Sequence, residues 1–336
     1  MTRPESPNTN RHIGTDPVGF CFPERATGQE RTILSMPRSP FALVLALLIG
    51  FASPIAAQSA ATGNQITILY DAFSDKPGLA LDWGYAVLVE FEGKRILFDA
   101  GNNAAMFEAN IKRLHVDLSK IDLVVLSHRH GDHTSGLRYV LSVNPNVPVY
   151  VPNDETFMQS TPAGFLAPSA EDTSLPAKMR YFGGTPPTPS PAHGTAWPAA
   201  RFHAVTKLTD ITPHIHLIST LSETPGYRDM PEISLILDTP QGPIVIVGCS
   251  HPGIENVLAN VEAQTHTSSI FELVGGLHLV VSTSSQIDHT VSALLDTYHV
   301  RRTALGHCTG EKTFAILQKR LGEKYRYAGV GEVLGL

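Results

Sequence analysis

The chain has 336 residues, of which 42% are hydrophobic and 17% are charged, and its formal net charge is −6. This composition is typical of an ordinary globular protein. The negative balance argues against a non-specific nucleic-acid binder, which needs a basic face, so we expect a small-molecule substrate and no nucleic-acid partner.

The beginning of the chain differs from the rest. Residues 1–35 are polar and are expected to be disordered, or to lie upstream of the true start. Residues 36–57 have the pattern of a signal peptide, with a short basic region, an apolar run at 41–51 and a cleavage site after Ala57. A membrane anchor or a buried helix is the alternative for the apolar run. We therefore expect a periplasmic or secreted protein with one mature domain at 58–336 and no stable membrane anchor after signal cleavage.

Beyond this leader, strand-like and helix-like segments follow one another. Strands are predicted at 66–70, 85–91, 95–98, 123–126, 147–151, 214–219, 232–238, 243–247, 271–274 and 303–305. Helices are predicted at 103–115, with Asn102 as the N-cap, and at 134–141, 254–265, 286–299 and 311–321. This order favours two sheets packed together with helices outside.

Residues 153–212 interrupt the pattern. They are dense in Pro, Gly, Ser, Thr and Ala, and we expect a long Pro-rich insertion with little regular structure. Such a segment is either a lid or binding loop, or a surface loop without a functional role.

Four candidate metal ligands stand directly after the apolar run at 121–126. They are His128, His130, Asp132 and His133. A strand that ends in such a loop can direct imidazoles and a carboxylate towards one point, and these are ligands that zinc and similar divalent ions prefer. The alternative, a solvated histidine-rich turn, does not account for the preceding strand or for the aspartate. The stretch therefore predicts a metal site.

Three later loops follow strands in the same way. His251 and His307 each come after an apolar strand and are predicted to be further metal ligands, with an ordinary surface position as the alternative for a loop histidine. For their neighbours Cys249 and Cys308, a role near the metal and a disulfide are both open. His278 follows a Gly-Gly pair and is predicted to line the pocket as a catalytic acid, base or anion-binding group, or to be a core histidine.

Asp99 ends a strand near this cluster. It is predicted either to accept a hydrogen bond from a ligating imidazole or to serve as a simple turn residue.

These motifs resemble the metallo-β-lactamase superfamily. Within it, the loops at 248–253, 275–279 and 307–310 resemble the subgroup of 7,8-dihydropterin-6-methyl-4-(β-D-ribofuranosyl)aminobenzene-5′-phosphate synthases. The resemblance implies a mixed α/β (α+β) fold, a four-layer αββα sandwich with a dinuclear metal site. It places His128 and His130 on one ion with a third histidine and Asp132, His133 and His307 on the other. It leaves His251 to fill a remaining position.

The resemblance and the ligands together predict an exported metal-dependent hydrolase. A metal-bound hydroxide would attack an ester, amide or phosphoester, with Asp132 and His278 as catalytic residues. Zinc is the expected metal, as two divalent ions, with manganese or iron as alternatives. A pterin-type synthase or transferase is the second hypothesis, and a non-catalytic metal-binding or sensor protein is the third.

Overall fold

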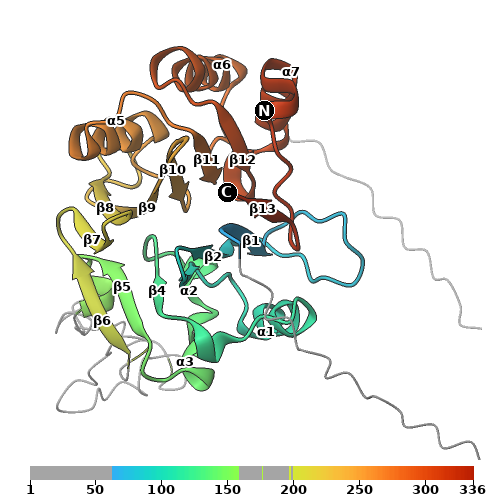
Figure 1. The fold of residues 1–336 in the computed structure, drawn as a ribbon, viewed down its shortest axis with the longest axis vertical. Helices are drawn as coiled ribbons and strands as arrows, with labels where there is room; N and C mark the ends of the chain where they lie inside the picture. Colours follow the sequence, from blue (N-terminus) through green and yellow to red (C-terminus); the bar gives the residue numbers. More distant parts are fainter. Residues whose placement is uncertain (1–62, 159–175, 177–196, 198–199) are drawn as a thin grey trace, which may run out of the picture. The chain divides into compact units, whose positions relative to one another are not determined.

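The computed structural model describes residues 63–158, 176, 197 and 200–336. Within this part of the chain, two β-sheets pack against each other and helices cover their outer faces (Figure 1). The predicted four-layer αββα fold is therefore confirmed. The predicted signal peptide and most of the predicted insertion lie outside the described residues. None of the described helices combines the length and the apolar character needed to cross a membrane.

The first sheet has seven strands in the order β13-β1-β2-β3-β4-β5-β6. The neighbours from β13 to β3 are antiparallel, and those from β3 to β6 are parallel. The strand bounds are Gln65–Tyr70 (β1), Ala86–Phe91 (β2), Lys94–Phe98 (β3), Leu123–Val125 (β4), Pro148–Pro152 (β5), Arg201–Val205 (β6) and Val333–Gly335 (β13).

The second sheet has six strands in the order β12-β11-β10-β9-β8-β7. Strands β10, β11 and β12 are parallel, and the others are antiparallel. The strand bounds are Thr209–Thr212 (β7), Ile215–Leu221 (β8), Pro231–Thr239 (β9), Gly242–Val247 (β10), Glu272–Gly275 (β11) and Arg302–Leu305 (β12).

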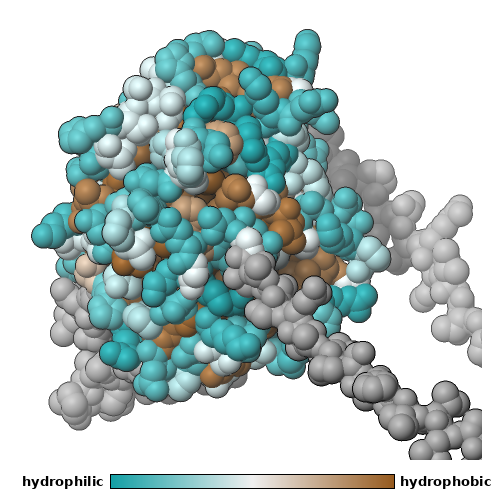
Figure 2. All heavy atoms as spheres, in the orientation of Figure 1, coloured by the Kyte–Doolittle hydropathy of each residue, from teal (hydrophilic) through white to brown (hydrophobic). Residues whose placement is uncertain are grey.

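Three apolar cores hold these layers together. One lies between the sheets, one lies under α1 and α3, and one lies under α5, α6 and α7. The inner strands are buried on both faces, which explains their almost continuous apolar runs. The helices are α1 (Ala104–Arg113), α2 (Gly131–Thr134), α3 (Leu137–Val143), α4 (Glu155–Met158), α5 (Ile254–Thr265), α6 (Ser284–Ser292) and α7 (Glu311–Leu321). The face drawn in Figure 2 is mostly hydrophilic, with apolar residues in separate patches.

The predicted cap of α1 is wrong by one residue. The N-cap is Asn103, whose side chain accepts hydrogen bonds from the backbone N–H groups of Ala105 and Met106. Asn102 instead donates from its side chain to Asp82 at 3.2 Å. Both asparagines suit a cap chemically, and this contact with a distant loop separates them.

Other boundaries also differ from the sequence prediction. The helix expected at 134–141 is split into α2 and α3, and α6 continues into a π-helical turn at Ala293–Thr297. The expectation of little regular structure at 153–212 is wrong at both ends, where α4, β6 and β7 form. Strand β6 forms because it extends the first sheet beside β5, with backbone pairing that propensity alone does not reveal.

Gly136 joins α2 to α3 where no side chain fits. A Cβ at this position would lie 1.9 Å from the carbonyl oxygen of Ala100, although the φ of −72° suits any residue. We expect Gly136→Ala to lower the free energy of unfolding by about 3 kcal/mol through this steric conflict alone. Urea denaturation measures the loss. Gly335→Ala, whose Cβ would meet nothing within 4 Å, is the control and should change stability by less than about 0.5 kcal/mol.

Candidate metal centre

The predicted ligands come together because their strands end at the same edge of the two sheets. Asp99 follows β3, the loop at 127–133 follows β4, the loop at 248–251 follows β10, and His307 follows β12. Neighbouring parallel strands present their carboxyl ends at one edge, so residues far apart in sequence converge there.

The first group of donor atoms consists of His128, His130 and His251, all within 4.8 Å of one another. His130 Nδ1 lies 3.1 Å from both His128 Nε2 and His251 Nε2. Burial lowers the pKa of His128 well below its usual range and that of His251 to about 2. Rings held neutral in this way present the form of imidazole that binds a metal ion.

The second group consists of Asp132, His133, Cys249 and His307. The atoms His133 Nε2, His307 Nε2 and Cys249 Sγ are each 3.2 Å from the other two. Asp132 Oδ2 lies 3.6 Å from His133 Nε2 and 3.5 Å from His307 Nε2. Cys249 and Cys308 are both free, so the structure does not contain the disulfide that the sequence had left open. Cys249 is thereby placed as a candidate ligand.

Asp99 orients rings of both groups. Its Oδ2 accepts hydrogen bonds from His133 Nδ1 at 2.6 Å and from the Ser127 hydroxyl at 2.8 Å. The Ser127 Oγ lies 2.9 Å from His128 Nδ1 and has already used its proton, so it accepts from that ring. Each imidazole then keeps its Nε2 lone pair for the donor group. Burial alone would lower the pKa of His133, but the Asp99 carboxylate outweighs it and raises the pKa to about 9.

Removing this carboxylate should weaken metal binding without removing a ligand. We expect Asp99→Asn to lower the zinc affinity by about 10- to 100-fold, because the amide cannot accept from His133 and Ser127 as the carboxylate does. Competition titration against a zinc chelator measures the change. The exposed carboxyl of Asp117, which caps a short 3₁₀ helix, provides the control Asp117→Asn, for which affinity should be unchanged. Equal affinity in Asp99→Asn and the wild type would contradict the orienting role.

Glu232 supports the loop after β10 and was not predicted from the sequence. It is 2% exposed on β9, and its carboxylate accepts the backbone N–H groups of Cys249, Ser250 and His251 at 2.8, 2.7 and 2.8 Å. Burial raises the pKa of Glu232, and these donors oppose the rise. A glutamate at the start of a mostly apolar strand was the available signal.

Asp71 supports His307 in a similar way and was also not predicted. It follows β1, is fully buried, and accepts the His307 backbone N–H at 2.9 and 3.1 Å. Burial raises the pKa of Asp71 to about 7. The sequence gives no local signal for this contact, because 236 residues separate the partners.

Several residues of the centre hold a left-handed backbone. The φ angles are 59° at Asp99, 63° at Ser250, 52° at His278 and 49° at His307. This region is unusual for a residue with a Cβ and is maintained only where the surrounding contacts demand it. The carboxylates of Asp71 and Glu232 supply such contacts at His307 and Ser250.

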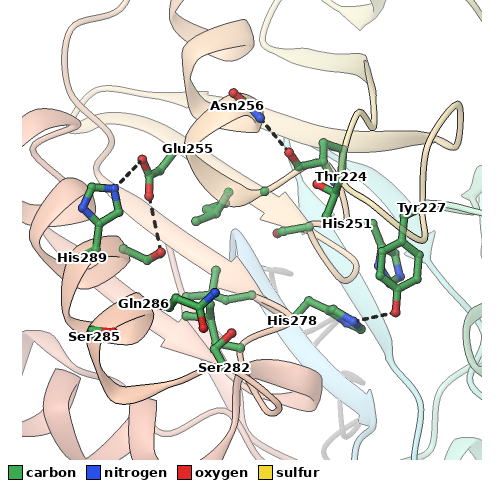
Figure 3. Close-up of a pocket in the computed structure, with 17 residues that line it drawn as sticks. Thr224, Tyr227, His251, Glu255, Asn256, His278, Ser282, Ser285, Gln286 and His289 are labelled. Atoms are coloured by element: carbon green, nitrogen blue, oxygen red, sulfur yellow. Dashed lines mark hydrogen bonds and ion pairs between the residues drawn. The ribbon is translucent and has the colours of Figure 1, made fainter.

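His278 lies beside the first group and forms a third candidate donor group with Cys249 and His251. Its ring centroid is 4.3 Å from that of His251. Its Nε2 lies 3.0 Å from the hydroxyl of Tyr227, a contact drawn as a dashed line in Figure 3. Its backbone N–H donates to Cys308 Sγ at 3.2 Å. The structure thus places His278 next to the centre, where its catalytic role remains a prediction. Tyr227 is a neighbour that the sequence did not single out.

The donor set suits divalent metal ions. Imidazoles, one carboxylate and one thiol converge in these groups, with supporting hydrogen bonds to the far sides of the His128 and His133 rings. Zinc accepts all three donor types. Two buried rings and one half-buried ring, with donor atoms within 4.8 Å of one another, would otherwise be costly once protonated. The residues present therefore fit a metal centre, and the assignment of each ligand stays a prediction.

Known proteins share both the sequence pattern and the fold. The 7,8-dihydropterin-6-methyl-4-(beta-D-ribofuranosyl)-aminobenzene-5′-phosphate synthase of Methanocaldococcus jannaschii is 26% identical over 273 residues, covering 75% of this chain and 89% of the relative. An uncharacterised protein of the same organism is 27% identical over 289 residues, covering 81% of this chain and 100% of the relative.

A solved structure and a family profile agree with these relatives. The crystal structure of Tm1679, a metal-dependent hydrolase of the beta-lactamase superfamily, has a TM-score of 0.60 and 24% identity, over 81% of this chain and 99% of that one. This likeness concerns the fold. The profile of the Metallo-beta-lactamase superfamily matches residues 83–294, more than half of the chain. This chain therefore belongs to the metallo-beta-lactamase superfamily, and its predicted similarity to the dihydropterin synthase subgroup is confirmed.

Proposed function

We propose that this protein is an exported metal-dependent hydrolase that cleaves an ester, amide or phosphoester bond of a small molecule. The observation that carries the proposal is the pair of donor groups, which share one edge of the sandwich and one loop. His130 and Asp132 are two residues apart yet belong to different groups. Two divalent ions bound at these adjacent groups would form the arrangement used by many hydrolytic metal sites.

The residues of this chain would divide the work as follows. His128, His130 and His251 would hold one ion, and Asp132, His133 and His307 would hold the other, together with the candidate Cys249. When bound, such ions lower the pKa of a water molecule and polarise the bond to be cleaved. Asp132 has a side chain that is 19% exposed, so it can also orient the attacking water. Asp99 and Glu232 keep the donors in position.

His278 is proposed to contact the substrate. Its Nε2 and the Tyr227 hydroxyl form a hydrogen-bonded pair at 3.0 Å, and both residues line the same pocket as His251 (Figure 3). Such a pair can donate to, or accept from, a substrate oxygen near the reacting bond.

The test combines metal analysis with a substrate screen. We expect the purified mature protein to contain two divalent ions per chain, with zinc predominating over manganese or iron. We expect it also to hydrolyse at least one member of a panel of lactones, phosphodiesters and β-lactams, with loss of activity in EDTA. Two bound ions without turnover of any substrate would instead favour the metal-binding or sensor reading.

A pterin-type synthase is the second candidate. It is favoured by the similarity to the M. jannaschii synthase, because the match covers 89% of that protein at 26% identity. Formation of the compound in that relative's name, followed by mass spectrometry, would support the synthase. Hydrolysis without this product would support the first proposal.

Export is proposed from the pattern at residues 36–57. The full chain, expressed in a bacterium with a periplasm, should appear in the periplasmic fraction with a mature N-terminus near Gln58. Recovery of the uncleaved chain from the cytoplasm would contradict export and would leave the metal chemistry untouched.

A further inference from the structure

A cavity of about 560 Å³ adjoins the metal centre. His251 belongs both to the first donor group and to the wall of this cavity, and His278 lines it as well. A molecule held at the metal centre can therefore extend into the cavity. This inference rests on the proposed function, because it treats the cavity as the site of the substrate's non-reacting part.

The cavity wall is rich in uncharged hydrogen-bonding groups. Among the described residues that line it, none is a lysine or an arginine. Hydroxyl and amide groups come from the loop before β9 and from the beginning of α6, and Figure 3 labels Thr224, Tyr227, Ser282, Ser285 and Gln286 among them. Such groups both donate and accept, which suits a ligand with several hydroxyls or amides.

The one carboxylate among the described lining residues lies where an anion would otherwise bind. The N-terminus of α5 faces the cavity without a side-chain cap, since its N-cap is Gly253, and a free helix N-terminus alone would attract negative charge. Glu255 in the first turn already supplies a carboxylate there. That carboxylate pairs with His289 at 3.5 Å and accepts from the Thr290 hydroxyl at 3.4 Å (Figure 3). A second anion would meet this carboxylate. Among the described lining residues, only the histidines His251, His278 and His289 could offer it a positive charge.

We propose that the cavity binds an uncharged substrate group that carries hydroxyls or amides, such as a sugar or a polyol, and that it discriminates against phosphate. The name of the M. jannaschii relative describes a compound with a 5′-phosphate. The cavity of this protein would disfavour such a group. It follows that the proposed substrate is a neutral sugar ester or a related amide rather than a phosphorylated sugar.

Binding measurements test this without any need for turnover. The zinc-loaded mature protein is titrated with methyl β-D-ribofuranoside and with N-acetyl-D-glucosamine, and separately with ribose 5-phosphate and N-acetylglucosamine 6-phosphate, by ligand-observed NMR. The cavity is obstructed by Ser282→Phe. The control is Ser284→Phe, a similar change two residues later at an exposed position that does not line the cavity.

We expect saturable binding of at least one neutral sugar, weakened fivefold or more by Ser282→Phe and unchanged by Ser284→Phe. Any binding of the phosphates should be unaffected by Ser282→Phe, because a phosphate would contact the metal ions rather than the cavity. The proposal is overturned if neither neutral sugar binds, if both variants have equal effects, or if Ser282→Phe weakens the phosphates as much as the neutral sugars. A failure of hydrolysis in the substrate screen would leave these binding results unchanged, so the two proposals can fail separately.

Discussion

The double substitution His128→Ala and His130→Ala is expected to remove stoichiometric metal binding at the first donor group. The variant loses two of the three imidazoles that converge there, and His251 alone cannot retain an ion against dialysis. For the substrate found in the screen, we expect kcat/KM to fall by about 10³-fold or more, which corresponds to about 4 kcal/mol of transition-state stabilisation. Elemental analysis after dialysis and steady-state kinetics provide the two measurements.

A second pair of histidines provides the control. His203 is exposed and stacks on Tyr150, and His214 lies at the surface beside Glu92. The substitution His203→Ala with His214→Ala should therefore retain both ions and the wild-type activity. Two ions retained in the His128→Ala and His130→Ala variant would show that the donor group does not bind metal.

Glu232→Ala is expected to have the largest effect on stability. Three buried N–H groups lose their acceptor, and no other described side chain accepts from them. Because unsatisfied buried donors keep their full desolvation penalty, we expect the free energy of unfolding to fall by about 3–5 kcal/mol. Denaturant unfolding of the metal-free protein measures this loss separately from metal binding.

The variant Glu232→Gln distinguishes the effect of Glu232 on stability from its effect on metal binding. The amide oxygen can still accept from Cys249 and Ser250, whereas the amide NH₂ would face the His251 N–H that Oε2 now accepts. This variant should be less destabilised than Glu232→Ala and should still bind zinc more weakly than the wild type, because His251 is displaced. If both variants unfold like the wild type, the carboxylate does not organise this loop.

The ligand loops could be predicted because each one carries its own signal. A strand followed within four residues by a histidine marks the loops at His128, His251 and His307, and the short His-x-His-x-Asp-His spacing needs no knowledge of the fold. The division of these residues between two ions was implied by family resemblance. The structure clusters the same residues, and their division between ions stays a prediction.

The supporting residues could not be predicted in this way. Asp71 and Glu232 act on backbone N–H groups, which every residue type possesses, so their partners leave no trace in the sequence. The strands at the ends of the insertion were missed for a related reason. Strand β6 forms by pairing with β5, and strand β7 forms by pairing with β8. The insertion is rich in Pro and Gly, and this composition obscured its short strand-forming runs.

The left-handed backbone conformation of several residues at the metal centre lowers the stability of the fold. Each L-residue in this region costs about 1–2 kcal/mol relative to an ordinary conformation, within a net folding stability of about 5–15 kcal/mol for a typical domain. Glycine would relieve the cost at Asp99, Ser250, His278 and His307, and at three of these positions it would also delete a ring or a carboxylate of the centre. Glycine at these positions should therefore stabilise the fold, while at Asp99, His278 and His307 it would weaken the proposed metal centre.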